Sequence, residues 1–175
     1  MGHVRIDTKA AAEVADGSGM IGPLFELRSE PAFHLDAQLG PVQEIGSLAA
    51  GHRRVVPIIG GTLEGPRLHA EILPGGADWQ LVTSTGSAAI EARYTARADD
   101  GELVLVHSRG FRSGPPEVLA RLAAGETVDP GEYYFRTLVT LETGAAAHAW
   151  VNERLFIAVA ARLPAGVVAD IYEIR

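Results

Sequence analysis

Three side chains in strand-like segments carry the groups that proton-transfer chemistry needs. Arg93, Tyr134 and Glu142 supply a guanidinium, a phenol and a carboxylate. A carboxylate can remove a proton from a substrate, and an arginine or a tyrosine can stabilise the oxyanion that forms. These residues are the predicted catalytic group of a cofactor-independent isomerase, cyclase or lyase, acting on a small aromatic or polyketide-like carbonyl or phenolic compound.

Further aromatic and polar side chains could form the wall of a binding pocket. The predicted substrate-binding residues are Trp79, Tyr94, Arg136, Trp150, Asn152, His34 and His107. Indole rings supply flat apolar walls, and a guanidinium presents a fork to two acceptor atoms. A structural alternative stays open for each residue, because tryptophans are often core and charged side chains often form surface salt bridges.

Metal, nucleotide and covalent mechanisms have little support in the sequence. There is no cysteine, none of the six histidines forms an HxH or HExxH pair, and no G-x-S-x-G occurs. The glycines at 60, 61 and 65 are not followed by the Gly-Lys-Ser/Thr ending of a phosphate loop. We therefore expect neither a metal nor a cofactor.

Composition limits the class of protein and its partners. The chain has 175 residues, 47% of them hydrophobic, which fits one globular domain. Its net charge is −7, and basic residues such as Arg53, Arg54, Arg109 and Arg112 are scattered among acids, which argues against nucleic acid as a partner. No apolar run approaches the roughly 18 residues of a membrane span, and residues 1–22 lack the apolar stretch that is typical of a signal peptide. A cytoplasmic location is expected, because the lack of cysteine suits a reducing compartment.

Short strands are the elements that must position these residues. Strand-like runs cover residues 24–33, 54–59, 67–73, 78–83, 88–98, 103–108, 132–142, 150–162 and 167–174. Turn signals separate them, among them Gly60-Gly61, Pro74-Gly75-Gly76 and Asp100-Gly101. This spacing predicts an all-β sandwich or barrel, and we favour a single antiparallel β-barrel because closure leaves no exposed edge. The barrel is expected over residues 23–175, after a flexible leader over residues 1–22.

Two segments and one acid carry more specific expectations. Residues 115–125 predict one short helix, with proline at its start and glycine at its end. The run from Trp150 to Arg162 favours a strand, because its apolar residues keep no period of 3.6. Asp78 is expected to bind nearby backbone amides and fix the Pro74-Gly75-Gly76 turn.

Strand alternation leaves the direction of the charged side chains open. Tyr134, Arg136 and Glu142 share one face of their run, and the other face is more apolar. Arg93 likewise shares a face with Glu91, opposite an apolar set. A barrel that binds a polar molecule could turn these faces inward, whereas a barrel with a dry core would turn them outward.

Several motifs in fixed order resemble one known family. They lie at residues 60–68, 73–79, 92–94, 133–137, 141–143, 150–152 and 171–173. The chain resembles, from about Pro23 to Ile174, the uncharacterised bacterial and fungal proteins of domain-of-unknown-function family three-two-three-seven. That resemblance implies a barrel of calycin-like or allene-oxide-cyclase-like architecture and no particular reaction. One departure, Thr85-Gly86 where the family has Asp-Gly, removes a candidate acid.

Three hypotheses about function remain at this point. The first is the cofactor-independent acid–base enzyme. The second is a non-catalytic barrel that binds a small hydrophobic ligand. The third is an assembly role, in which the outward side chains of residues 132–142 form a homodimer interface.

Overall fold

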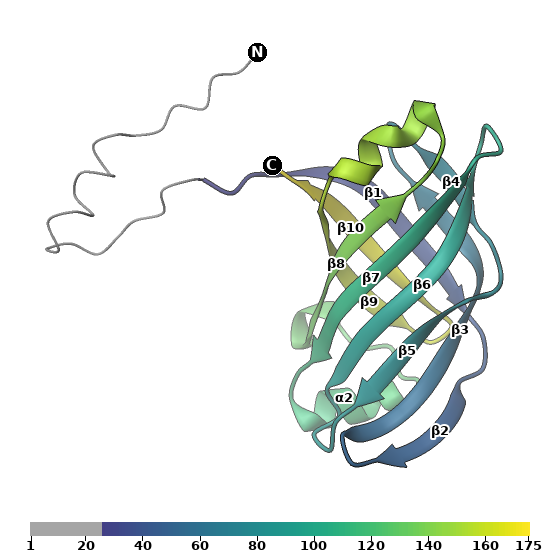
Figure 1. Ribbon diagram of the computed structural model, residues 1–175. Helices are drawn as coiled ribbons and strands as arrows, with labels where there is room; N and C mark the ends of the chain where they lie inside the picture. The colour runs from purple at the N-terminus through teal and green to yellow at the C-terminus, as the bar shows by residue number, and fades with distance from the viewer. Residues whose placement is uncertain (1–25) are drawn as a thin grey trace, which may run out of the picture.

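Residues 26–175 fold as a closed antiparallel β-barrel with one α-helix (Figure 1). The computed structural model describes residues 26–175, so the predicted leader over residues 1–22 lies outside the described part. The strands and helices, in chain order, are β1 (Ser29–Leu39), β2 (Gln43–Leu48), β3 (Gly51–Glu64), β4 (His69–Ile72), β5 (Gly76–Val82), β6 (Ala88–Ala98), β7 (Leu103–Ser113), α2 (Pro116–Ala123), η1 (Pro130–Glu132), β8 (Tyr134–Glu142), η2 (Ala146–Glu153), β9 (Phe156–Leu163) and β10 (Gly166–Ile174).

The barrel closes because β1 pairs with two strands at once. β1 is antiparallel to β10 on one side and to the second half of β3 on the other. The ring continues from β10 through β9, β8 and β7 to β6. β4 and β5 both pair with β3 and with β6, so together they fill one position of the eight-stranded ring. The predicted single antiparallel barrel is therefore confirmed.

Three local predictions need correction. The strand expected from Trp150 to Arg162 is two elements, η2 and then β9, because a 3-10 turn with Trp150 and Val151 packed on the core precedes the strand. The Gly60-Gly61 turn is not a turn: β3 runs through it, and Gly61 has φ of +128° where β1 passes very close. β2 was not predicted at all, because most of its six residues are exposed and leave no apolar pattern. The predicted helix is confirmed as α2.

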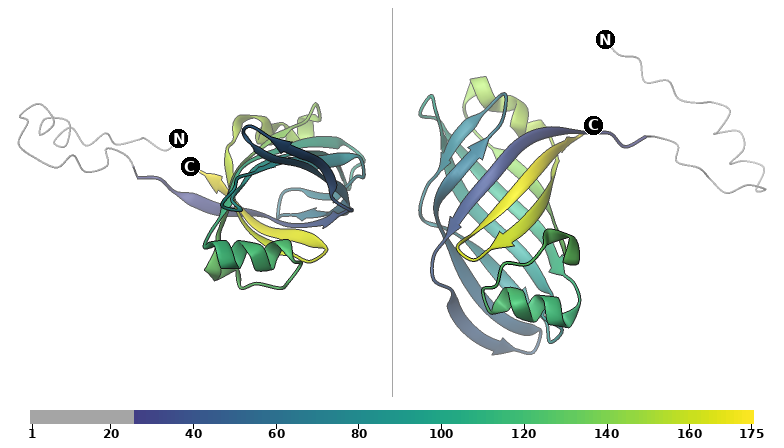
Figure 2. Two further views of the ribbon diagram at one scale, coloured as in Figure 1. Left: turned by 90° about the horizontal axis from the view of Figure 1, so that it is seen from below. Right: turned by 180° about the vertical axis from the view of Figure 1, so that it is seen from behind.

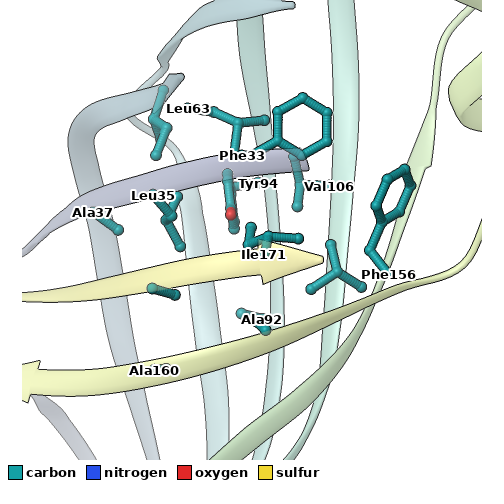
Figure 3. Close-up of a cluster of buried hydrophobic side chains, with 14 of the residues drawn as sticks. Phe33, Leu35, Ala37, Leu63, Ala92, Tyr94, Val106, Phe156, Ala160 and Ile171 are labelled. Carbon is teal, nitrogen blue, oxygen red and sulfur yellow. The ribbon is translucent and has the colours of Figure 1, made fainter. Parts of the chain in front are cut away.

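One end of the barrel is a solid apolar plug. The most deeply buried side chains include Phe156, Leu63, Ile72, Leu141 and Val151. Figure 3 shows Phe33, Leu63, Val106 and Phe156 gathered from separate strands around the barrel interior. η2 lies over this end, and α2 lies at the opposite end (Figures 1 and 2). The two ends are therefore built differently, and the end nearer α2 holds the cavity described next.

Candidate functional site

A cavity of about 150 Å³ lies inside the barrel, between the apolar plug and α2. Its wall is mostly apolar, with Leu35, Ile58, Ile90, Phe135, Val139, Ala158 and Ile171 among the lining residues. Leu122, Ala123 and Gly125 contribute the part nearest α2. An engineered apolar cavity of similar volume in another protein accommodates benzene, so this space fits a compact molecule with one ring.

Polar side chains gather on the part of this wall that the α2 end of the barrel supplies. They are Arg54 of β3, Asp78 and Gln80 of β5, Ser108 and Arg112 of β7, Thr137 of β8 and Arg162 of β9. Strand pairing brings them together, since Arg54 lies opposite Gln80, and Arg112 lies opposite Phe135 at the start of β8. Each of these polar residues lines the cavity, so its side chain lies on the inner face of its strand.

Asp78 is a buried carboxylate that is only 8% exposed. Its Oδ1 accepts a hydrogen bond from the Glu91 backbone amide at 2.9 Å, and its Oδ2 accepts one from the Gln80 side-chain amide. Burial raises the pKa of Asp78, and the Gln80 and Glu91 hydrogen bonds and the charges of Arg112 and Arg54 partly oppose this. The prediction that Asp78 fixes the Pro74-Gly75-Gly76 turn is wrong, because the backbone amide that donates to Asp78 is that of Glu91 in β6 and not one in the turn.

Arg112 is the most unusual group in the cavity wall. It is only 6% exposed, and its Nε has no hydrogen-bond acceptor among residues 26–175. Burial and the nearby charges of Arg54 and Arg162 lower the pKa of Arg112 to about 10, so it is still a cation at neutral pH. A buried donor without an acceptor is costly for folding, which makes this guanidinium a candidate for binding a ligand.

The other two arginines of the cavity wall, Arg54 and Arg162, are each fixed by hydrogen bonds of the guanidinium. Arg54 donates from Nε to the Gln80 side-chain oxygen at 2.9 Å, so Gln80 links it to Asp78. Arg162 donates from Nη1 to the carbonyl oxygens of Leu163 and Gly166. Burial, and next the charge of Arg54, lowers the pKa of Arg162. Both arginines line the cavity.

Tyr94 is the predicted site residue that lines the cavity. It is 5% exposed, and Figure 3 shows its hydroxyl oxygen inside the barrel near Leu35 and Ile171. Burial raises the pKa of Tyr94, so its hydroxyl keeps its proton and can act only as a neutral donor or acceptor. Nearby, Ser108 donates to the Thr137 hydroxyl at 2.8 Å.

Arg93, His107 and Glu142 lie near one another, but on the outer face of the barrel. Arg93 is opposite His107 across β6 and β7, and its guanidinium lies 3.5 Å from the Glu91 carboxylate. Burial, and next the charge of Arg93, lowers the pKa of His107, whose Nε2 has no hydrogen-bond acceptor in the described chain. Glu142 lines a shallow surface depression together with Asn152. The outward alternative for the charged faces therefore describes this barrel.

Four further predicted residues also lie outside the cavity. Tyr134 is 52% exposed on the outer face of β8, and Arg136 lies beside its ring and donates to the Phe135 carbonyl oxygen. Trp79 is 40% exposed. His34 pairs with Asp170 at 2.9 Å on the exposed face of β1 and β10.

Trp150 and Asn152 have structural contacts at the plugged end. The Trp150 ring stacks on Phe33 at a centroid distance of 6.1 Å, and the Arg67 guanidinium covers the ring at 3.6 Å. Asn152 accepts a hydrogen bond from the Thr143 amide and donates one to the Thr143 carbonyl oxygen. They do not share a strand face as predicted, because both lie in the 3-10 turn η2.

The sequence did contain a signal for the cavity residues that the prediction missed. Arg54 precedes Val56 and Ile58 on one strand face, and Arg112 follows Val104 and Val106 at even spacing. A charged side chain in step with buried apolar positions must point to the interior of a barrel. Arg162 follows the same rule, in step with Ala158 and Ala160. Asp78 and Gln80 do not, because they alternate with the apolar Ala77, Trp79 and Leu81, and only the tertiary structure shows that they line the cavity.

No group of three or more histidine or acidic side chains within residues 26–175 could hold a metal ion. In the same part of the chain, no helix is both long and apolar enough to cross a membrane.

The amino-acid sequence matches a known protein family. Residues 27–174 match the family described as "Protein of unknown function (DUF3237)". A UPF0311 protein of Rhodopseudomonas palustris is 38% identical over 148 residues, which are 85% of this chain and 97% of that protein.

Solved structures share the fold. A β-barrel like protein from Acinetobacter baumannii has 39% identity and a TM-score of 0.76, covering 89% of this chain and 100% of that one. A structure described as an enzyme from Penicillium herquei has a TM-score of 0.65 over 86% of this chain and 96% of that one, and at 16% identity it shows a shared fold alone. With a family match over nearly all the described residues, the chain belongs to the DUF3237 family of β-barrel proteins.

Proposed function

We propose that the protein binds a small carbonyl or phenolic compound in the barrel cavity and catalyses a cofactor-independent proton transfer on it. Isomerisation, cyclisation and elimination are the reactions of this kind. The observation that carries the proposal is a buried carboxylate, Asp78, in the wall of a mostly apolar cavity that Arg112 also lines. The buried Nε of Arg112 has no hydrogen-bond acceptor among residues 26–175.

Asp78 is the proposed general base. Its two oxygens accept hydrogen bonds from Gln80 and from the Glu91 amide, which fix the carboxylate plane and leave one lone pair on each oxygen. Burial raises its pKa, which makes it a stronger base than an exposed aspartate. In this proposal Asp78 has the role that the sequence suggested for Glu142.

Arg112 is the proposed oxyanion-binding group. When Asp78 removes a proton next to a carbonyl, the electron pair moves to the oxygen, which becomes an enolate. A guanidinium already buried beside that oxygen stabilises the new charge without reorganisation of solvent. Return of the same proton to another atom completes an isomerisation and restores Asp78. The neutral hydroxyl of Tyr94 can donate a hydrogen bond to a second oxygen of the substrate.

The test follows the first proton transfer, so it does not require the natural product to be known. Small aromatic ketones and phenols are screened by thermal shift, and each ligand that binds is incubated with the protein in D₂O. Proton NMR then measures exchange of its acidic C–H for deuterium. Asp78→Asn should slow the exchange by about a hundredfold or more, the usual contribution of a positioned base.

Glu142→Gln is the matched control, because Glu142 is a carboxylate on the outer face of the same barrel. It should leave the exchange rate unchanged. Loss of exchange in Glu142→Gln with normal exchange in Asp78→Asn would contradict the proposal and favour the role first assigned to Glu142.

The second candidate function is a non-catalytic barrel that binds a small hydrophobic ligand. The mostly apolar wall of the cavity favours it. It predicts ligands that raise the melting temperature and show neither deuterium exchange nor chemical change.

A further inference from the structure

We infer that the ligand of the cavity is an organic anion, namely a small carboxylate on an apolar one-ring body. The inference rests on the cavity of the proposed function and adds the class of molecule that fills it. The carboxylate binds Arg112 through two of its five N–H groups, which leaves the others for the oxyanion of the proposed reaction, and the ring lies against the apolar wall.

The charges that face the cavity do not balance. Its lining contains three guanidinium groups, Arg54, Arg112 and Arg162, and one carboxylate, Asp78. Asp78 uses both oxygens on amide donors, one from Gln80 and one from the backbone of Glu91. The lining therefore carries two more positive than negative charges. An unpaired charge is strongly unfavourable at Arg112, which is buried, whereas Arg54 and Arg162 are half-buried.

Arg112 provides the specific contact for an anion. It is 94% buried, it borders the cavity, and its Nε finds no acceptor in the described part of the chain. A carboxylate matches a guanidinium because its two oxygens accept two parallel N–H bonds. Arg54 and Arg162 are already oriented by Gln80 and by backbone carbonyls, so they add a fixed positive field around the same point.

The apolar part of the cavity wall determines which chemical group the ligand carries besides its carboxylate. Phe135, Tyr94, Ile90 and Ile171 are among the apolar and aromatic side chains that line the cavity. A volume of about 150 Å³ leaves room for one ring and one carboxylate. A free phosphate would leave this apolar surface uncovered, and a neutral ring compound would leave Arg112 unpaired.

A matched pair of probes tests the inference on the full chain. Benzoate and benzamide have nearly the same shape and differ in charge. Each is titrated at pH 7 and constant ionic strength while amide chemical shifts are followed by NMR. Benzoate should bind saturably, and benzamide should bind at least about tenfold more weakly, since a charged hydrogen-bonded pair is worth roughly 1.5–3 kcal/mol.

Variants locate the contact. Arg112→Gln should weaken benzoate binding by about tenfold or more, and Arg54→Met is a second variant in case the first does not fold. Arg109→Gln is the control, because Arg109 lies on the same strand and is exposed on the outer face. Asp78→Asn should bind benzoate more tightly than the wild type, because it removes the negative charge that faces the ligand.

Equal binding of the two probes, no binding of benzoate, or benzoate binding that survives both arginine substitutions would overturn the inference. If the protein does not bind benzoate but catalyses Asp78-dependent deuterium exchange on a neutral ketone, the inference about the anion is wrong and the proposed function is supported. If benzoate binding depends on Arg112 but no ligand shows Asp78-dependent exchange, the inference about the anion is supported and the proposed catalytic function is wrong.

Discussion

At the scale of single residues, Arg112 and Asp78 stand out because the fold holds both away from water. Each lies in the cavity wall and is almost fully buried. Proteins seldom bury such groups without a complete set of partners, because desolvation outweighs what one hydrogen bond returns. Both residues should therefore reduce stability in exchange for binding or catalysis, and this can be measured directly.

Arg112→Met should not destabilise the protein. Methionine has a similar length and needs no acceptor, so we expect the free energy of unfolding to stay the same or to rise by about 1 kcal/mol, as when other buried charges are replaced by apolar residues. Urea denaturation followed by circular dichroism measures it. A decrease of more than about 2 kcal/mol would instead mean that Arg112 holds the barrel together.

Asp78 should make the stability depend on pH in one direction. Its pKa in the folded protein lies above the ordinary value of 3.8, mainly because of burial. The folded state then binds the proton more tightly than the unfolded state, so the stability from this group is complete below pH 3.8 and is lost as pH rises through the raised pKa. Urea denaturation of the wild type and Asp78→Asn between pH 4 and pH 7 tests this. The variant should gain stability relative to the wild type as pH rises, and a constant difference would contradict the assignment.

At the scale of elements, the antiparallel pairing of β1 with β3 closes the barrel. Gly61 permits this close pairing, because a Cβ at that position would lie 2.0 Å from the Asp36 carbonyl oxygen. Its φ of +128° is also a conformation that other residues rarely adopt. A glycine pair that looks like a turn in the sequence is therefore a point of close approach between two strands.

Gly61→Ala should destabilise the protein much more than Gly75→Ala does. Both glycines have a positive φ, but a Cβ at Gly75 would meet nothing within 4 Å. Backbone strain alone costs about 1–3 kcal/mol, and only Gly61→Ala adds a clash with another strand. Thermal unfolding of the two variants separates these costs, and equal melting temperatures would show that β1 and β3 can separate freely.

At the scale of the whole molecule, the barrel joins a dry apolar plug to a charged cavity. Phe33 and Phe156 (Figure 3) pack against each other, and the Trp150 ring of η2 stacks on Phe33. Arg54, Arg112 and Arg162 line the cavity together with residues of α2. This division gives one chain both a core for stability and a space for a ligand. The homodimer through the outer face of β8 stays a prediction, for which light scattering of the purified protein is the test.

Ala92→Leu should abolish ligand binding without destabilising the fold. Ala92 lines the cavity, so a leucine there would fill much of the space without replacing any charged group. Filling a cavity commonly raises stability by about 0.5–2 kcal/mol. The melting temperature should stay the same or rise while benzoate binding disappears. Ala89→Leu, on the other face of the same strand, is the control and should keep binding.

The sequence by itself determined the class of fold and most of its strands. Alternating apolar residues such as those of β6 define a strand and its buried face without further information, because the period of two is a local property. The family resemblance extended this to the barrel. The sequence could not locate the candidate site, because residue type alone does not distinguish Arg93 and Glu142 from Asp78 and Arg112.

Only the tertiary structure decided which charged side chains share a cavity. Arg54, Asp78, Arg112 and Arg162 come from four strands, and nothing local in the chain shows that these strands meet at one end of a closed ring. Closure fixes the inward direction of each face, whereas strand alternation only divides residues into two sets. The reason is physical: burial and electrostatic coupling depend on distances in space, and pairing across a barrel joins residues far apart in the chain.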